Sequence, residues 1–141
     1  MGGREHQEHR ALNFVLTGEQ VRYRDEVRRF AERELNHDVD GREGLCREAW
    51  ARCAELGIQG LPVPRRYGGR EADPLTTVAA LEALGHGCRD GGLLFSLGAH
   101  TWSCEVPILL FGSEPQRRRY LPGLCGGSLI IAQFVRGKIA A

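Results

Sequence analysis

The run VPILLFGSEPQRRRYLPGL, residues 106–124, constrains the fold more than any other part of the chain. Gly112 predicts the end of one helix, because glycine tolerates the positive φ that is common just past a helix C-terminus. Ser113 stands three residues before Gln116, which is the spacing of a capping box, and it predicts that a second helix begins there. Pro122 is expected to end that helix, since proline cannot continue a helix without losing a hydrogen bond. The run therefore predicts two consecutive helices with a sharp turn between them.

This run resembles the end of the N-terminal helical domain in the acyl-CoA dehydrogenase family, which has the pattern P-I-L-x-F-G-[ST]-E-x-Q-[KR]-x-[KR]-Y-L-P-x-L. The matching positions here extend from Pro107 to Leu124. Weaker similarities to the family's first helix and to its L-G-x…V-P…Y-G-G turn lie upstream, at Leu16-Thr17 with Gln20, at Leu56-Gly57-Ile58, at Val63-Pro64 and at Tyr67-Gly68-Gly69. Order and spacing agree over most of residues 16–132. The resemblance covers the first of the three domains of the family.

Length and charge limit the class of protein. A chain of 141 residues forms one domain at most, and 42% hydrophobic with 26% charged residues is ordinary for a soluble globular protein. The net charge of +1 gives no strong field, so we expect no nucleic-acid partner. We also expect no membrane span, because no run of about 18 apolar residues occurs. Residues 1–10, MGGREHQEHR, have no apolar core and do not look like a secretory signal.

The cysteines predict a reducing compartment. Five occur, an odd number, and none forms a C-x-x-C pair. This fits reduced thiols in a cytoplasmic protein better than a disulfide framework. Cys46 and Cys53 lie seven residues apart on one face of a predicted helix, where they are either small buried apolar residues or a metal or redox pair. The first interpretation is favoured, and no metal site is expected.

Apolar periodicity and caps predict an all-α bundle of five to six helices with a C-terminal extended tail. We expect a flexible leader over 1–15, the helical domain over 16–127 and the start of a β-domain or a divergent tail over 128–141. Within the helical domain, helices are predicted after Thr17, over 45–56, from Asp73 to Leu84, from Asp90 onward and over 114–120.

Two of these helices carry specific expectations. The arginines of the first helix are interleaved with Asp25 and three glutamates, so a solvated face is favoured over a nucleic-acid contact. The helix after Asp90 is apolar over much of its circumference and is expected to be the most buried element, with Trp102 in the core. Pro107 is expected to kink or restart it.

The last run, SLIIAQFV at 128–135, predicts a strand without a partner in this chain. An unpaired apolar strand is an aggregation hazard, so its sheet is expected to belong to sequence outside this chain. In the resembled family, the chain enters a β-domain at this position.

The resemblance implies a flavin enzyme that oxidises an acyl thioester between its α and β carbons. A carboxylate removes the α proton while the β hydride goes to the flavin, and the thioester carbonyl must be hydrogen-bonded. The family's base is a glutamate of the C-terminal domain, which this chain is expected to lack. We therefore assign no catalytic residue here, and neither Glu82 nor Glu105 is given the role.

The family's cofactor is FAD, and its first flavin-contacting segment follows the strand with a pattern like A-[FY]-x-[LVM]-T-E-P-x-x-G-S-D. The positions that correspond to flavin contacts are Gln133 and Val135. Arg136-Gly137-Lys138 stand where the T-E-P turn would be. We therefore expect that the isolated chain does not bind FAD tightly, as a truncated or frame-shifted gene product would not.

The resemblance also implies that the helix after Asp90 forms one wall of the acyl pocket. The candidate substrate-binding residues are Phe95, Ser96, Ala99, His100 and Ser103. Ordinary core packing is an equal alternative for Phe95 and Ala99, and a hydrogen-bonded structural role is favoured over catalysis for His100.

Two functions follow. The first is the N-terminal portion of a dehydrogenase acting on acyl groups carried by CoA or by a carrier protein, inactive alone. The run GCRDGG at 87–92, followed by an A-H pair, looks closer to the biosynthetic, carrier-linked members. The second is a freestanding helical interaction module of the same descent, without catalysis. Acyl chain length and oligomeric state, including a homo-oligomer, remain open.

Overall fold

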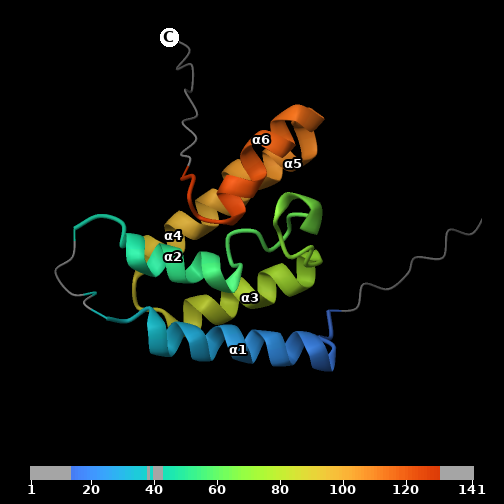
Figure 1. Cartoon of the computed structure of the whole chain (residues 1–141). Helices are drawn as coiled ribbons and strands as arrows, with labels where there is room; N and C mark the ends of the chain where they lie inside the picture. The colour runs from blue at the N-terminus through green and yellow to red at the C-terminus, as the bar shows by residue number, and fades with distance from the viewer. Residues whose placement is uncertain (1–13, 38, 40–42, 131–141) are drawn as a thin grey trace, which may run out of the picture.

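The computed structural model describes residues 14–37, 39 and 43–130. These residues form the all-α bundle that the sequence predicts, and they contain no strand. The helices are α1 (Gly18–Glu34), α2 (Arg47–Leu56), the 3-10 turn η1 (Arg65–Tyr67), α3 (Pro74–Gly87), α4 (Gly91–Ala99), η2 (His100–Glu105), α5 (Val106–Phe111) and α6 (Glu114–Cys125). Because α4, η2 and α5 run on without a break, they form one long helix, and the bundle has five main rods (Figure 1).

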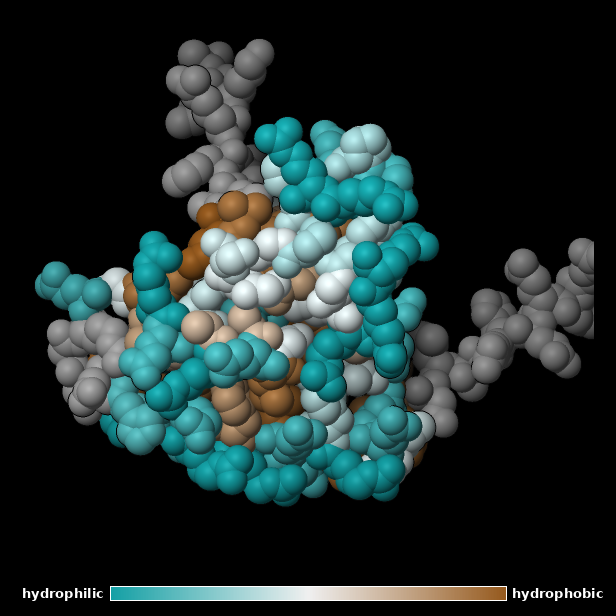
Figure 2. Space-filling model, in the orientation of Figure 1, coloured by the Kyte–Doolittle hydropathy of each residue, from teal (hydrophilic) through white to brown (hydrophobic). Residues whose placement is uncertain are grey.

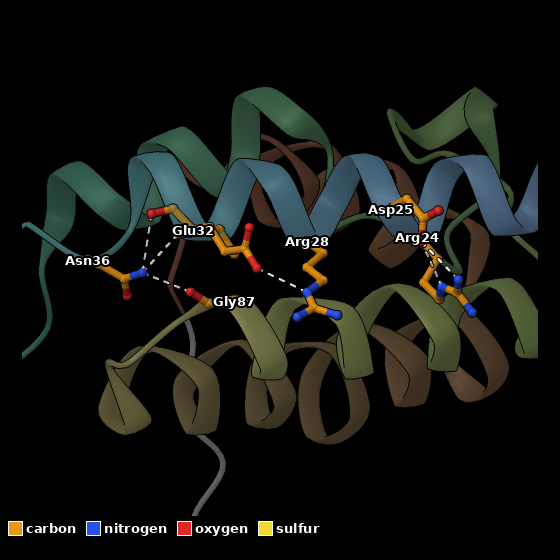
Figure 3. Close-up of polar contacts among 7 residues, drawn as sticks. Arg24, Asp25, Arg28, Glu32, Asn36 and Gly87 are labelled. Carbon is orange, nitrogen blue, oxygen red and sulfur yellow. Dashed lines mark hydrogen bonds and ion pairs between the residues drawn. The ribbon is translucent and has the colours of Figure 1, made fainter.

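Helices α1 and α3 lie side by side and form one layer of the bundle, and α2 lies over them (Figure 1). Val27 and Ala31 of α1 have no exposed surface, as the apolar stripe on this helix predicts. The Asn36 side chain donates to the carbonyl of Gly87 at 2.8 Å (Figure 3). It also accepts from the Arg89 N–H at 2.7 Å, so it joins the ends of α1 and α3. The outer face of α1 is polar, with Arg28 paired to Glu32 (Figure 3).

The helix starts predicted at Thr17, Asp73 and Asp90 are confirmed, whereas the helix predicted over 45–56 begins at Arg47. Thr17 and Gln20 form a complete capping box, in which the Thr17 N–H donates to Gln20 Oε1 at 2.8 Å and Thr17 Oγ1 accepts from Gln20 N–H at 3.2 Å. Asp73 accepts from the Thr76 N–H at 2.9 Å, and Asp90 accepts from the Leu93 N–H at the same distance. Each cap satisfies N–H groups that the first helical turn leaves without partners.

Helix ends are predicted less well than helix starts. Helix α3 runs on to Gly87 rather than stopping at Gly85, because Gly87 lets α1 approach closely: a Cβ at Gly87 would lie 2.7 Å from that of Ala31. Gly112 does end α5, but with φ −68° and ψ 150° it is extended. It is glycine because a Cβ would lie 2.4 Å from the Ile108 carbonyl oxygen.

Helix α6 passes through Pro122 and ends at Cys125, so the expectation that Pro122 terminates it is wrong. Proline inside a helix costs about 3 kcal/mol. Burial of Leu121 and Leu124, neither of which has exposed surface, offsets this cost by roughly 1.5–3 kcal/mol for each side chain. These residues pack with Val63 and Tyr67 in a second small core beneath α6.

The long helix is also less buried than its apolar sequence predicts. Leu93 and Leu97 are each 1% exposed, but Trp102 is 45% exposed, so its expected place in the core is wrong. On an α-helical period counted from the buried Leu93 and Leu97, Trp102 falls on the opposite side of the helix, so the periodicity itself places it outward. Trp102 lies in η2, which is a π-helical turn. Pro107 follows this turn and does not break the helix, since widening relieves the clash between a proline ring and the preceding turn.

The expected strand at 128–135 falls mostly outside the described residues. Residues 128–130 are not a strand: the Leu129 N–H donates to the Gly123 carbonyl at 3.0 Å and turns the chain back over α6. Among the described residues, the continuous helix Gly91–Phe111, with a mean hydropathy of 1.3, is long and apolar enough to cross a membrane. Core helices of soluble proteins meet the same criterion, so this feature alone does not overturn the expectation from sequence.

Candidate functional site

The outer face of α4 and η2 carries most of the residues that sequence reasoning singled out. Phe95 is 79% exposed, Ser103 is exposed, and Ser96 and Ala99 are half-buried. The Ser96 hydroxyl donates to the Gly92 carbonyl at 2.8 Å, which is an ordinary bond within the helix. Trp102, which sequence reasoning placed in the core, joins this exposed face. We call Phe95, Ser96, Ala99, Trp102 and Ser103 the α4 face.

His100 lies on the opposite side of the same helix and does not join the α4 face. Its side chain is 1% exposed. Nε2 lies 3.2 Å from the carbonyl oxygen of Leu124, which can only accept, so Nε2 carries the hydrogen. The ring meets Trp50 edge to face, with centroids 5.0 Å apart. In this position His100 ties the long helix to the end of α6.

Glu105 is the buried carboxyl group next to His100, and it has no exposed surface. Its Oε1 lies 3.5 Å from His100 Nε2. Burial raises the pKa of Glu105 above its ordinary value, and His100 and Cys125 partly oppose that effect. A carboxyl group closed off from solvent cannot reach a substrate, which agrees with assigning Glu105 no catalytic role. Sequence reasoning gave no signal that this residue would be buried.

Trp50 completes the buried polar cluster. It is 2% exposed, and its indole Nε1 donates to the Gly127 carbonyl at 3.1 Å. The amide of Gln59 in turn donates to the Trp50 carbonyl at 2.9 Å. Trp50 and His100 therefore both hold the segment in which the chain leaves α6.

The cysteines form no disulfide in the described part of the chain. All five are free thiols. Burial raises the pKa of Cys53 to about 12, with Cys88 adding to the effect, and burial with Glu105 raises that of Cys125 to about 12. Thiols with such pKa values remain protonated and unreactive near neutral pH. No group of three potential metal ligands occurs among the described residues.

An apolar groove of about 350 Å³ lies between α5 and α6, lined by Pro107, Ile108, Phe111 and Tyr120 among others. Phe111 and Leu110 beside it are 84% and 61% exposed. Further apolar surface occurs where the described chain ends, at Leu129 and Ile130, next to the grey tail in Figure 2. By contrast, the surface over α1 is mainly hydrophilic (Figure 2).

The predicted flavin contacts Gln133 and Val135 lie outside the described residues. What the structure offers an FAD is therefore the α4 face, which presents Phe95 and Trp102. A flat aromatic ring system can stack on such a surface, so the residues present fit one side of an isoalloxazine ring. They supply no base and no anion cradle for its phosphates.

The described residues form a bundle of five main helices, and the longest of them, residues 91–111, has an exposed apolar face. These features define a class of helical domain that presents a surface to another domain or to a ligand. The family described as "Acyl-CoA dehydrogenase, N-terminal domain" matches residues 17–128. The chain belongs to this family and corresponds to its N-terminal domain.

Among its relatives is an L-prolyl-[peptidyl-carrier protein] dehydrogenase of a Serratia species. It is 38% identical over 124 residues, covering 86% of this chain and 32% of the relative. A probable acyl-CoA dehydrogenase of Bacillus subtilis, YngJ, is 32% identical and covers 84% of this chain. The chain therefore spans about a third of the length of these two relatives, and 21% of a second L-prolyl-[peptidyl-carrier protein] dehydrogenase, from Pseudomonas fluorescens.

Two solved structures extend the comparison. The prolyl acyl carrier protein oxidase AnaB superposes with a TM-score of 0.79 at 46% identity, over 82% of this chain and 32% of its own. PigA with FAD and proline gives a TM-score of 0.78 at 38% identity, over 84% of this chain and 32% of its own. FAD therefore occurs in full-length members of this family.

Proposed function

We propose that the α4 face forms one wall of the acyl and flavin site of a dehydrogenase that acts on acyl thioesters. The observation that carries this proposal is the exposure of Phe95 and Trp102 on a helix whose other side is core. An apolar surface that solvent would otherwise contact is typical of a ligand or domain interface. In such an enzyme, Phe95 and Trp102 would help to hold FAD and the acyl chain, and FAD would supply the hydride acceptor. This chain's own residues contribute apolar contact and exclude water.

A carrier protein is the favoured bearer of the acyl group. The relatives named for prolyl carrier proteins are 38% to 46% identical to this chain, whereas those named for acyl-CoA dehydrogenases are 29% to 37% identical. The free thiols further support a reducing, cytoplasmic setting.

A chimera tests the proposal. Residues 17–128 of this chain would replace the corresponding domain of the Serratia relative, and FAD content and prolyl-carrier dehydrogenation would be measured. We expect a yellow, active chimera. Phe95→Lys or Trp102→Lys should lower its kcat/KM at least about tenfold, since a charge on this wall must be desolvated when the site closes.

Val78→Lys is the matched control, because Val78 is an exposed apolar residue of α3, 55% exposed and outside the α4 face. It should leave activity within about twofold. If Val78→Lys and Phe95→Lys reduce activity equally, the α4 face is not the acyl wall. If the chimera folds but holds no FAD, the second candidate, an interaction module without catalysis, is favoured. The exposed Leu110 and Phe111 beside the α5–α6 groove would suit that role.

A further inference from the structure

The arginines of this chain are distributed unevenly between two surfaces. Helix α1 carries five arginines and five acidic residues, so its charges balance along the helix. The pair formed by η1 and α6 carries five arginines and one acidic residue, Glu114. A surface with such an excess of one sign creates a local field although the whole chain is only +1.

The structure places three of these arginines, Arg66, Arg117 and Arg118, near Glu114. The Tyr67 hydroxyl of η1 donates to Glu114 Oε2 at 2.6 Å and fixes η1 against the start of α6. Arg118 donates from Nε to Glu114 Oε1 at 2.8 Å, and Arg117 Nη1 lies 3.9 Å from Glu114 Oε2. The guanidinium of Arg66 lies 4.9 Å from the centre of the Tyr67 ring. Glu114 therefore pairs with Arg117 and Arg118, and Arg66 adds to the positive potential around it.

The remaining charges do not neutralise this surface. Arg65 is exposed and reaches Glu71 only at 3.9 Å. The Tyr67 hydrogen bond, together with Arg118 and Arg66, keeps the pKa of Glu114 below its ordinary value, which is what a positive local potential does. In addition, Nε of Arg117 is buried and has no acceptor within the described residues. These arginines have more N–H donors than the described residues around them have acceptors.

We propose that the arginine cluster, Arg65, Arg66, Arg117 and Arg118, is the docking surface for an acidic carrier protein. This inference rests on the proposed function for the identity of the partner. Guanidinium groups bind carboxylates through paired N–H donors, so an acidic helix of a carrier domain is a fitting ligand. Charges of this kind raise association rates and select the partner more than they add affinity.

The test is binding of the apo form of the peptidyl carrier protein on which the Serratia relative acts, labelled with a fluorophore and followed by anisotropy. We expect salt-sensitive binding to the unmodified chain. Arg66→Gln/Arg118→Gln should weaken it at least about fivefold. Arg66→Glu/Arg118→Glu should weaken it further. Circular dichroism would verify that both variants remain helical.

The matched control is Arg29→Gln/Arg33→Gln, which removes the same charge from exposed positions of α1. It should change binding by less than about twofold. The proposal is overturned if control and cluster variants weaken binding equally, if the unmodified chain does not bind, or if a short DNA duplex or anionic lipid vesicles bind as tightly as the carrier. The apo carrier bears no acyl group, so its binding does not depend on the α4 face. If the chimera shows that the α4 face is not the acyl wall, this binding result is unchanged, and the two proposals can therefore be refuted independently.

Discussion

His100 and Glu105 are titratable side chains with almost no exposed surface, and both lie in the π-helical turn. His100 and Glu105 are neighbours of each other, and the groups around them include the Trp50 indole, the Leu124 carbonyl and the Cys125 thiol. Burial makes a charged carboxylate expensive and so raises the pKa of Glu105, and His100 partly opposes this effect. At the scale of residues, the interior of this domain is therefore sensitive to pH.

Glu105→Gln should remove part of that sensitivity. The pKa of Glu105 is raised in the folded state, so folding takes up a proton between the ordinary value of 4.5 and the folded value. The resulting stability is present below that window and is lost as pH rises through it. Urea unfolding between pH 5 and 8 should show a fall in unfolding free energy for the unmodified chain and a flatter profile for Glu105→Gln. A steeper profile in the variant would contradict the burial argument.

Trp50 should contribute more to stability than Trp102, although the sequence predicts Trp102 in the core. Trp50 is 2% exposed and donates to Gly127, so Trp50→Ala should lower the unfolding free energy by about 3–5 kcal/mol. Trp102 is 45% exposed, and Trp102→Ala should cost below about 1 kcal/mol. Chemical denaturation of both variants measures the difference. If Trp102→Ala lowers the unfolding free energy more than Trp50→Ala does, Trp102 belongs to the core.

At the scale of elements, the tightest approach is between α1 and α3. Gly87 makes it possible, because a Cβ there would lie 2.7 Å from both the Ala31 Cβ and the Arg28 carbonyl oxygen. Asn36 then closes the end of the pair by bonding to Gly87 and Arg89. The absence of a side chain at Gly87 and the hydrogen bonds of the Asn36 amide therefore fix the register of α1 and α3.

Gly87→Ala should separate these helices and cost about 1–3 kcal/mol. Gly85→Ala is the matched control, because it lies in the same helix with nothing within 4 Å of the added Cβ. It should be neutral or stabilising by up to about 1 kcal/mol, since alanine favours helix. Thermal unfolding of both variants compares them directly. Equal effects of both substitutions would show that the close approach carries no energetic weight.

Sequence predicts the helix starts because a cap is a local event. Thr17, Asp73, Asp90 and Ser113 each satisfy N–H groups two or three residues away, so the sequence contains the whole interaction. Helix ends depend on what packs against them. Pro122 stays inside α6 and Gly87 inside α3 because distant residues bury the neighbouring turns, which local rules do not include.

At the scale of the whole molecule, the sequence predicts which helix bears the candidate site. It does not predict correctly, for every side chain of that helix, whether the side chain faces solvent. Phe95 and Ser103 are exposed, whereas His100 points inward and Trp102 points outward. The expectation for Trp102 rests on the apolar character of the whole helix, whereas the helical period counted from Leu93 and Leu97 places His100 inward and Trp102 outward. The arginine cluster, by comparison, depends on η1 meeting α6 across about 50 residues, a contact that no local pattern reveals.

The isolated chain should not retain flavin. It offers one apolar face for a ring and, within the described residues, no cradle for the phosphates, so purified protein should be colourless and show no absorbance near that of bound FAD. Dialysis against excess FAD followed by desalting provides the measurement. Stoichiometric yellow protein that reduces an electron acceptor on addition of an acyl thioester would contradict this prediction and assign catalysis to the chain itself.

The π-helical turn at His100–Glu105 has a consequence for comparing this chain with others. A single π turn inside an α-helix is equivalent to the insertion of one residue. Positions counted forward from Asp90 and positions counted backward from Ser113 therefore belong to two registers that differ by one place. In a relative whose long helix is uninterrupted, an ungapped alignment would pair every residue on one side of this turn with the wrong neighbour. A one-residue deletion within 100–105 would restore the match.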